Sequence, residues 1–448
     1  MWHGKKKTYI AAAILLVVTA LATVIVVKSA FQIGTTPTVY VGVTYGGNSV
    51  AEAKQLIDKV KGYSNLFALQ SGDLQRDFKA VDEIGDYAID AGMYFLPYFG
   101  NYVEATFSAW LDSAKQRWGT KLLGIYHSDD LGGKMLDDYS KFTDVETGNT
   151  IGKTRYGDIV VEKPNGVVIH YELNGEINLL EPTQEHPDGV YSTYYPNGSV
   201  TVKQSNVKPS TSYQQLANQR PFRDQNETAA RFISRNQQDI GNLKNSTTVF
   251  SSDYALYWFD YKSGYDVMLT QLGWNISLNQ QIALCRGAAT AQGKDWGVIV
   301  TWKYNSPPYL DSGSEVFNQL KTSYEAGAKY FLLFNFYEEG TSNPYGTLGE
   351  EHFQALENFW NNVVNNSGVV HGSVEADSVL VLPQNFGGGL RWRTDIVWGV
   401  FKPDETSGQL WDLLQQSLNA HGLKLDVAFE DLDNPVSGKY SNIIHFSD

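Results

Sequence analysis

The stretch Leu122-Leu123-Gly124-Ile125-Tyr126-His127-Ser128-Asp129-Asp130-Leu131-Gly132-Gly133 leads from an apolar run into a group of polar side chains. The apolar part favours a buried strand, and the glycine pair predicts a turn just after the two carboxylates. In parallel α/β sheets, ligand-binding groups gather beyond the carboxyl ends of the strands. We therefore expect His127, Asp129 and Asp130 at the edge of a site, although Asp and Gly are also ordinary turn residues.

Strand-like and helix-like segments alternate on both sides of this stretch, which is typical of βαβ units and a parallel sheet. Strands are predicted at residues 38–43, 66–69, 93–97, 122–126, 254–260, 267–272, 297–302 and 329–336. Helices are predicted at residues 50–62, 78–91, 106–118, 278–292, 315–326 and 350–364. Eight strands with eight connections predict an α/β fold, a (β/α)8 barrel of the TIM type.

Two segments depart from the barrel pattern. Turn signals such as Asn174-Gly175 separate alternating β-type runs between residues 139 and 246, which predicts a β-rich insertion after the fourth strand. Residues 369–448 predict a small C-terminal α/β domain. The two halves of the barrel then occupy residues 34–138 and 247–368.

The first 33 residues predict a transmembrane anchor. Three lysines at residues 5–7 precede an apolar run over residues 9–27, which is long enough to cross a bilayer. The lysines predict a cytoplasmic amino terminus, with the bulk of the chain extracellular. A cleaved signal peptide is the alternative. Sequons that fit an exported glycoprotein stand at Asn197, Asn226, Asn245, Asn275 and Asn365.

The composition excludes several classes of function. The chain has 448 residues and a net charge of −14, so no basic field exists to bind nucleic acid. Aromatic residues make up 13%, with 11 Trp and 27 Tyr, which suits stacking against sugar rings. The one cysteine, Cys285, rules out an intramolecular disulfide and a cysteine-based metal site. No Gly-x-Ser-x-Gly motif is present, which disfavours a serine hydrolase, and no cofactor is predicted.

The predicted strand ends bring carboxylates and aromatic rings together. Glycoside hydrolysis requires this combination, with two carboxyl groups about 5–10 Å apart and rings on which a sugar can stack. The catalytic candidates are Asp129, Asp130 and Asp260. The substrate-binding candidates are Tyr45, Asp73, Tyr98, His127, Trp258, Trp302 and Asn335. Glu338 and Glu339 follow the eighth predicted strand.

Structural interpretations compete with these roles. Asp260 could cap a turn, Trp258 could pack under the outer helices, and His127 could be a hydrogen-bonded core histidine. No second His or Cys stands at ligand spacing, which disfavours a transition-metal site, whereas Asp73 with Asp129 and Asp130 could hold a hard cation.

The barrel resembles a glycoside hydrolase barrel. Runs at residues 124–136, 252–266, 282–302 and 377–398 resemble a poorly characterised family of membrane-anchored archaeal surface proteins. That family carries an acidic pair followed by Gly-Gly at the end of the fourth strand, as Asp129-Asp130 and Gly132-Gly133 do here. The resemblance implies the barrel architecture and a location at the cell surface.

The largest glycosidase clan differs from this chain at two positions. It carries Asn-Glu on strand 4 and Glu at the end of strand 7, where this chain has Asp129-Asp130 and Trp302-Lys303. The alternative to an enzyme is therefore a barrel that binds carbohydrate or serves a structural role.

The sharpest hypothesis from the sequence pairs Asp129 or Asp130 with Asp260, on a sugar stacked against Trp258 or Trp302. Strands 4 and 5 are neighbours in such a barrel, so their carboxyl ends lie close together. Because side chains alternate along a strand, Trp258 and Asp260 should share a face. For the same reason, only one of Asp129 and Asp130 should face the pocket.

Overall fold

The computed structural model describes residues 39–446, apart from 101–106, 138–141, 144–147, 154–157, 183–189, 202–211, 218–221, 223, 242, 305, 307 and 337–344. The predicted anchor at residues 1–33 lies outside the described residues. Within the described part, no helix combines the length and apolar character that a membrane span requires.

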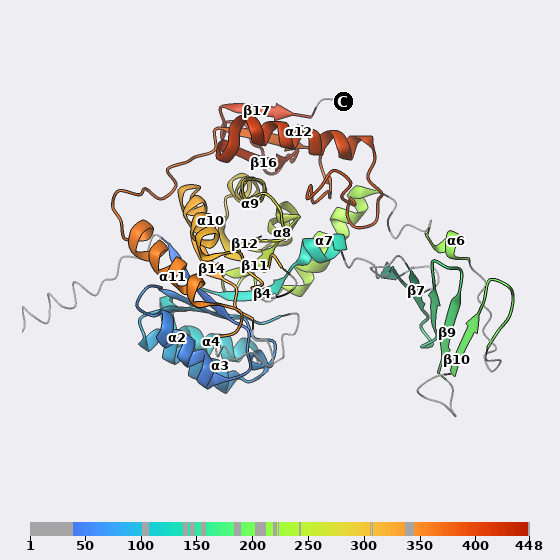
Figure 1. Cartoon of the computed structure of the whole chain (residues 1–448), viewed down its shortest axis with the longest axis horizontal. Helices are drawn as coiled ribbons and strands as arrows, with labels where there is room; N and C mark the ends of the chain where they lie inside the picture. Colours follow the sequence, from blue (N-terminus) through green and yellow to red (C-terminus); the bar gives the residue numbers. More distant parts are fainter. Residues whose placement is uncertain are drawn as a thin grey trace, which may run out of the picture. The chain divides into compact units, whose positions relative to one another are not determined.

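Eight parallel strands form the central sheet, in the order β3-β2-β1-β14-β13-β12-β11-β4. They are β1 (Tyr40–Tyr45), β2 (Leu66–Leu69), β3 (Tyr94–Pro97), β4 (Ile125–Asp129), β11 (Val249–Asp253), β12 (Val267–Leu272), β13 (Asp295–Val300) and β14 (Tyr330–Leu333). Parallel bridges from Phe95 to Leu122 and from Tyr98 to Tyr126 join the two ends of the sheet. The strands therefore form a closed (β/α)8 barrel, as the sequence predicts (Figure 1).

Helices connect consecutive strands of the barrel. They are α2 (Val50–Val60), α3 (Phe78–Asp90), α4 (Phe107–Trp118), α5 (Leu131–Asp137), α7 (Gln225–Asp239), α8 (Tyr257–Ser263), α9 (Leu278–Gln292), α10 (Gly313–Glu325) and α11 (Glu350–Phe359). In α2, the Ser49 side chain accepts the first-turn N–H of Glu52, and the buried residues recur with helical spacing. Figure 1 shows α2, α3 and α4 side by side along the first strands.

The predicted fifth strand at residues 254–260 is wrong. The strand is β11, which ends at Asp253, and the following aromatic run forms helix α8. A short, mostly buried run rich in aromatic residues fits a strand and a helix equally well, and here Gly264, with φ 110°, caps the helix. By contrast, the predicted strands at residues 66–69 and 267–272 are confirmed residue for residue.

The polar stretch after α5 forms an antiparallel sheet of its own. Its strands are β5 (Phe142–Thr143), β6 (Thr150–Lys153), β7 (Ile159–Glu162), β8 (Val168–Tyr171), β9 (Ile177–Glu181) and β10 (Val190–Tyr194). Alternate residues such as Val161, Ile169 and Leu179 pack in a separate core. A short helix, α6 (Tyr213–Ala217), follows the sheet. The domain boundaries drawn from the sequence stay predictions.

The last residues form a three-stranded parallel sheet in the order β16-β15-β17. Its elements are β15 (Ser378–Leu382), α12 (Glu405–His421), β16 (Leu425–Phe429) and β17 (Asn442–His445). Helix α9 packs on β16, where Arg286 forms a buried ion pair with Asp426 at 2.7 Å. A Cβ at Gly287 would lie 2.2 Å from the Val427 carbonyl oxygen, so this close packing requires glycine.

A candidate acidic site at the carboxyl ends of the strands

Two consecutive carboxylates, Asp129 and Asp130, stand at the end of β4 and are called the acid pair below. Ser128 and Asp130 have left-handed φ values of 62° and 57°, which interrupts the strand alternation. As a result both carboxylates reach one ammonium group: the Lys134 Nζ lies 3.3 Å from an Asp129 oxygen and 3.4 Å from an Asp130 oxygen. The expectation that only one of the two faces the pocket stays a prediction.

The glycine pair places that lysine. Gly132 and Gly133 begin helix α5 instead of forming the predicted turn. Both donate their N–H groups to Asp253 at the end of β11, Gly133 at 2.8 Å. A Cβ at Gly133 would lie 2.1 Å from the Tyr254 ring. Without side chains, the first turn of α5 can therefore rest on the end of β11, and Lys134 comes one helical turn after Asp130.

The Asp130 carboxyl group lies in a partly buried, hydrogen-bonded setting. Gln271 near the end of β12 donates from Nε2 to an Asp130 oxygen and, at 3.0 Å, to the Ser252 hydroxyl. Burial and the neighbouring charge of Asp129 raise the pKa of Asp130 to about 6, against the opposing effect of Lys134 and Gln271. Such a carboxyl group can give up or take up a proton near neutral pH.

Two tyrosines line the barrel beside the acid pair. The Tyr126 hydroxyl donates to Ser252 Oγ at 2.7 Å and accepts from the Gln70 amide at 3.3 Å. The Tyr98 ring packs edge-on against Tyr126 with centroids 5.3 Å apart. Burial and the charges of Asp129 and Asp130 raise the pKa of Tyr98, so its hydroxyl stays protonated and can donate.

Asp260 does not stand beside the acid pair as an accessible partner. It lies on α8, where it is fully buried and neither oxygen has a hydrogen bond of good geometry. Burial and the adjacent Asp253 raise the pKa of Asp260 well above its usual value. Burial and the charge of Asp130 likewise raise the pKa of Asp253, to about 7. Burial therefore disfavours the charged form of both carboxyl groups.

Trp258 and His127 are also core residues. Trp258 is 3% exposed, and its ring lies 5.2 Å from that of Phe429 in β16. Its predicted position beside a sugar followed from the incorrect fifth strand. His127 is 1% exposed, and its Nδ1 lies 2.8 Å from the Phe99 carbonyl oxygen. His127 follows Tyr126, which takes the inward position of the strand.

Three further candidates lie in or next to the loops that follow the strands. The buried Tyr45 hydroxyl donates to Glu52 of α2 at 3.0 Å. Asp73 is exposed and precedes a short 3-10 turn without capping it through its side chain. Asn335 is buried, and its side-chain oxygen accepts the Leu348 N–H at 3.4 Å.

Trp302 does reach the carboxyl ends of the strands. Its ring packs at 5.4 Å from Tyr309 and 5.7 Å from Phe336. Its carbonyl oxygen accepts the N–H of Trp274, whose indole N–H donates in turn to Gln271 at 3.1 Å. Trp274 is 40% exposed and lies on the loop after β12. Glu338 and Glu339 lie outside the described residues.

The structure adds residues that sequence reasoning missed. Gln271 is a polar amide near the end of an otherwise apolar predicted strand, which is a signal for a site residue. Lys134 stands four residues after Asp130, the spacing of one helical turn. In the part of the chain that the structure describes, no group of three His, Cys, Asp or Glu side chains could hold a metal ion.

No family model and no curated protein matches the sequence. Similar solved structures include GH5_18 from Streptomyces cattleya in complex with GlcNAc, at 8% identity over 92% of this chain and 99% of that chain, with a TM-score of 0.46. Another is the Thermobaculum terrenum O-GlcNAc hydrolase, at 8% identity over 72% and 59%, with a TM-score of 0.30. A third is an HpcH/HpaI aldolase from Desulfitobacterium hafniense, at 11% identity over 66% and 86%, with a TM-score of 0.28.

These similarities are remote. The assignment of the barrel is based on the strand order and strand pairing of this chain. The chain is thus a (β/α)8-barrel protein with an acid pair at the carboxyl ends of its strands. The resemblance to archaeal surface proteins finds no matching family model.

Proposed function

We propose that the chain is a glycoside hydrolase that works through the acid pair. The observation that carries this proposal is the environment of Asp130, which combines a side chain that is still 23% exposed, an adjacent carboxylate and a pKa of about 6. A glycosidase needs a carboxylic acid that still holds its proton near neutral pH and can give it to the leaving oxygen.

The two carboxyl groups take different roles. Asp130, with its raised pKa, protonates the leaving oxygen, and the Gln271 amide holds one of its oxygens in place. Asp129, ion-paired to Lys134, supplies negative charge beside the developing oxocarbenium ion. Trp274 offers an exposed ring face for stacking a sugar, next to Trp302.

The group that attacks the anomeric carbon has several candidates. Asp260 is too deeply buried to reach a substrate. Asp129 stands on the same strand end as Asp130, and Glu338 or Glu339 follows β14 in the sequence. Asn variants of Asp129 and Gln variants of the two glutamates, each combined with azide as an external nucleophile, identify the attacking group by rescue of the rate.

A non-catalytic carbohydrate-binding protein is the second candidate. The contact of Lys134 with both carboxylates favours it, because an ammonium group that neutralises both carboxylates opposes proton transfer. Turnover distinguishes the two candidates, since only the enzyme releases reducing sugar from a polysaccharide.

Screening of the purified protein against aryl glycosides and polysaccharides tests the proposal. In Asp130→Asn we expect kcat on a polysaccharide, whose leaving group needs a proton, to fall by about 10²–10⁴-fold, with sugar binding retained. Asp90→Asn is the matched control, because Asp90 is exposed at the end of α3, before β3 begins, and so lies away from the carboxyl ends of the strands. Full turnover by both the Asp129→Asn and the Asp130→Asn protein would contradict the assignment.

We also propose that residues 1–33 anchor the protein, with the barrel outside the cell. The apolar run at residues 9–27 and the lysines before it support this topology. Protease added to intact cells should remove an epitope at the carboxyl terminus. A protected epitope would rule out this orientation.

A further inference from the structure

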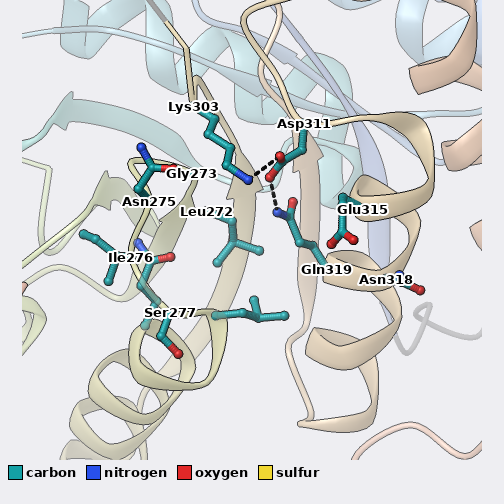
Figure 2. Close-up of a pocket in the computed structure, with 12 residues that line it drawn as sticks. Leu272, Gly273, Asn275, Ile276, Ser277, Lys303, Asp311, Glu315, Asn318 and Gln319 are labelled. Carbon is teal, nitrogen blue, oxygen red and sulfur yellow. Dashed lines mark hydrogen bonds and ion pairs between the residues drawn. The ribbon is translucent and has the colours of Figure 1, made fainter. Parts of the chain in front are cut away.

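A pocket of about 450 Å³ opens between the loop after β12 and the first turns of α10. Its size falls within the range of about 300–1,000 Å³ that small-molecule sites occupy. Leu272 and Gly273 line one side, and Lys303, Asp311 and Gln319 line the other (Figure 2). The pocket therefore lies at the same ends of the strands as the acid pair.

Gln271 connects this pocket to the acid pair. Its side chain donates to Asp130, and its carbonyl oxygen accepts the amide of Gln281, which lines the pocket. The next residues along the chain, Gly273 and Asn275, also line the pocket and flank Trp274. Trp274 therefore stands on the same loop as two residues that line the pocket.

The charged groups that line the pocket are two carboxylates and one ammonium group. Asp311 accepts from Lys303 at 2.6 Å and from the Gln319 amide at 2.9 Å, and Figure 2 shows these three side chains pointing toward one another. The Gln319 Oε1 atom is buried and has no hydrogen-bond partner. Glu315 adds a second carboxylate against the one ammonium group of Lys303. The pocket therefore favours a ligand that donates hydrogen bonds and carries no negative charge.

We propose that this pocket is a second sugar subsite, which binds a neutral hexose unit next to the unit cleaved at Asp130. The inference rests on the proposed function and specifies its substrate as an oligosaccharide or polysaccharide of neutral sugars. Sugar hydroxyl groups donate to the Asp311 and Glu315 carboxylates, which line the pocket. A uronic acid or a sulfated sugar would place like charges together.

The test compares the kcat/KM for a neutral oligosaccharide with that for the aryl glycoside of its terminal sugar. Asn318→Trp fills the pocket from the exposed side of α10, and Gln319→Leu removes the amide that holds the Asp311 carboxylate in place. Both variants should lower the ratio of the two kcat/KM values at least tenfold, chiefly through KM for the oligosaccharide. Asn362→Trp is the matched control, since Asn362 is exposed and does not line the pocket.

The outcomes separate the two proposals. An unchanged ratio in both pocket variants overturns the subsite and leaves the hydrolase intact. If the parent binds an oligosaccharide by calorimetry without cleaving it, a tenfold weaker binding in the pocket variants supports the subsite while the hydrolase fails. If the parent binds no neutral oligosaccharide, or prefers a uronic-acid oligosaccharide of equal length, the subsite is wrong.

Discussion

The proton on Asp130 depends on neighbours that act in opposite directions. Burial and the charge of Asp129 raise the pKa of Asp130 to about 6, and Lys134 and Gln271 oppose that rise. In a glycosidase this residue must be protonated to act, so its activity is present below its pKa and lost above it. The choice of these few side chains therefore sets the alkaline limit of the reaction.

The pH profile of kcat/KM should accordingly fall as the pH rises through about 6. Lys134→Met removes a positive charge and should move this fall to higher pH. Asp129→Asn removes a negative charge and should lower the pKa of Asp130, which carboxyl ¹³C NMR measures even in a slow variant. If the pKa moved in the same direction in both variants, Asp130 would not be the titrating group.

The sequence predicted the two consecutive carboxylates but not the side chains that contact them. Asp129 and Asp130 stood out because a strand end with two carboxylates is unusual. Asp260 was misplaced because its position was argued from strand alternation, and the residue lies on a helix. Gln271 donates to Asp130 only because the folded barrel places β12 near β4, with β11 between them. The two residues are 141 positions apart in the sequence.

The junction of β11, α5 and α8 is the element that supports the site. Asp253 at the end of β11 accepts the N–H groups of Gly132 and Gly133 at the start of α5, and it lies beside Asp260 of α8. This junction fixes the position of Lys134 through the first turn of α5. It also buries two carboxyl groups, which makes its stability depend on pH.

Asp260 should make the free energy of unfolding fall with rising pH. Its folded pKa lies well above the unfolded value of 3.8, so the folded state keeps a proton that the unfolded state loses above that value. The stabilisation is complete below the unfolded pKa and decreases as the pH rises toward the folded pKa, by up to about 1.4 kcal/mol per pH unit for one proton. Asp260→Asn removes the titrating carboxyl group and should flatten this slope. Urea unfolding between pH 5 and pH 8 measures the slope, and equal slopes in parent and variant would show that Asp260 does not hold this proton.

Gly133→Ala should disturb both the stability and the activity of the protein. The added Cβ would lie 2.1 Å from the Tyr254 ring, so α5 or the ring has to move, at a cost of about 1–3 kcal/mol. The displacement carries Lys134 away from the acid pair. Gly62→Ala is the control, because a Cβ at Gly62 meets nothing within 4 Å. Equal thermal unfolding temperatures for the two variants would contradict the close packing at α5.

Helix α9 of the barrel packs against the small C-terminal sheet. Arg286 of α9 pairs with Asp426 of β16, and its guanidinium also donates to the carbonyl oxygens of Val374, Leu423 and Leu425. Because both charged side chains are buried, each depends on the other for its charge to be compensated.

Arg286→Met should therefore destabilise the protein by about 3–5 kcal/mol, since it leaves Asp426 buried without its partner. The exposed ion pair of Arg393 with Asp412 provides the control, and Arg393→Met should cost no more than about 1 kcal/mol. Equilibrium unfolding in urea gives both values. Similar losses in the two variants would mean that α9 and β16 are not held together by the buried pair.

At the scale of the whole molecule, the alternation of strands and helices was sufficient to predict the barrel. Its closure depends on the pairing of Tyr98 with Tyr126, a long-range contact that no local pattern encodes. The fifth strand was misplaced because α8 is short and buried on most of its residues, which leaves no period that distinguishes helix from strand. The predicted anchor at residues 1–33 stays a prediction, since it lies outside the described residues.

The role of Asp130 as general acid is tested by the kcat/KM of Asp130→Asn on two substrates that differ in their leaving group. A general acid matters for a sugar leaving group, which needs a proton, and hardly at all for dinitrophenolate, which leaves without one. In Asp130→Asn, kcat/KM should fall by about 10²–10⁴-fold for an oligosaccharide and by less than about tenfold for the dinitrophenyl glycoside. An equal loss on both substrates, or no loss on either, would show that Asp130 is not the acid.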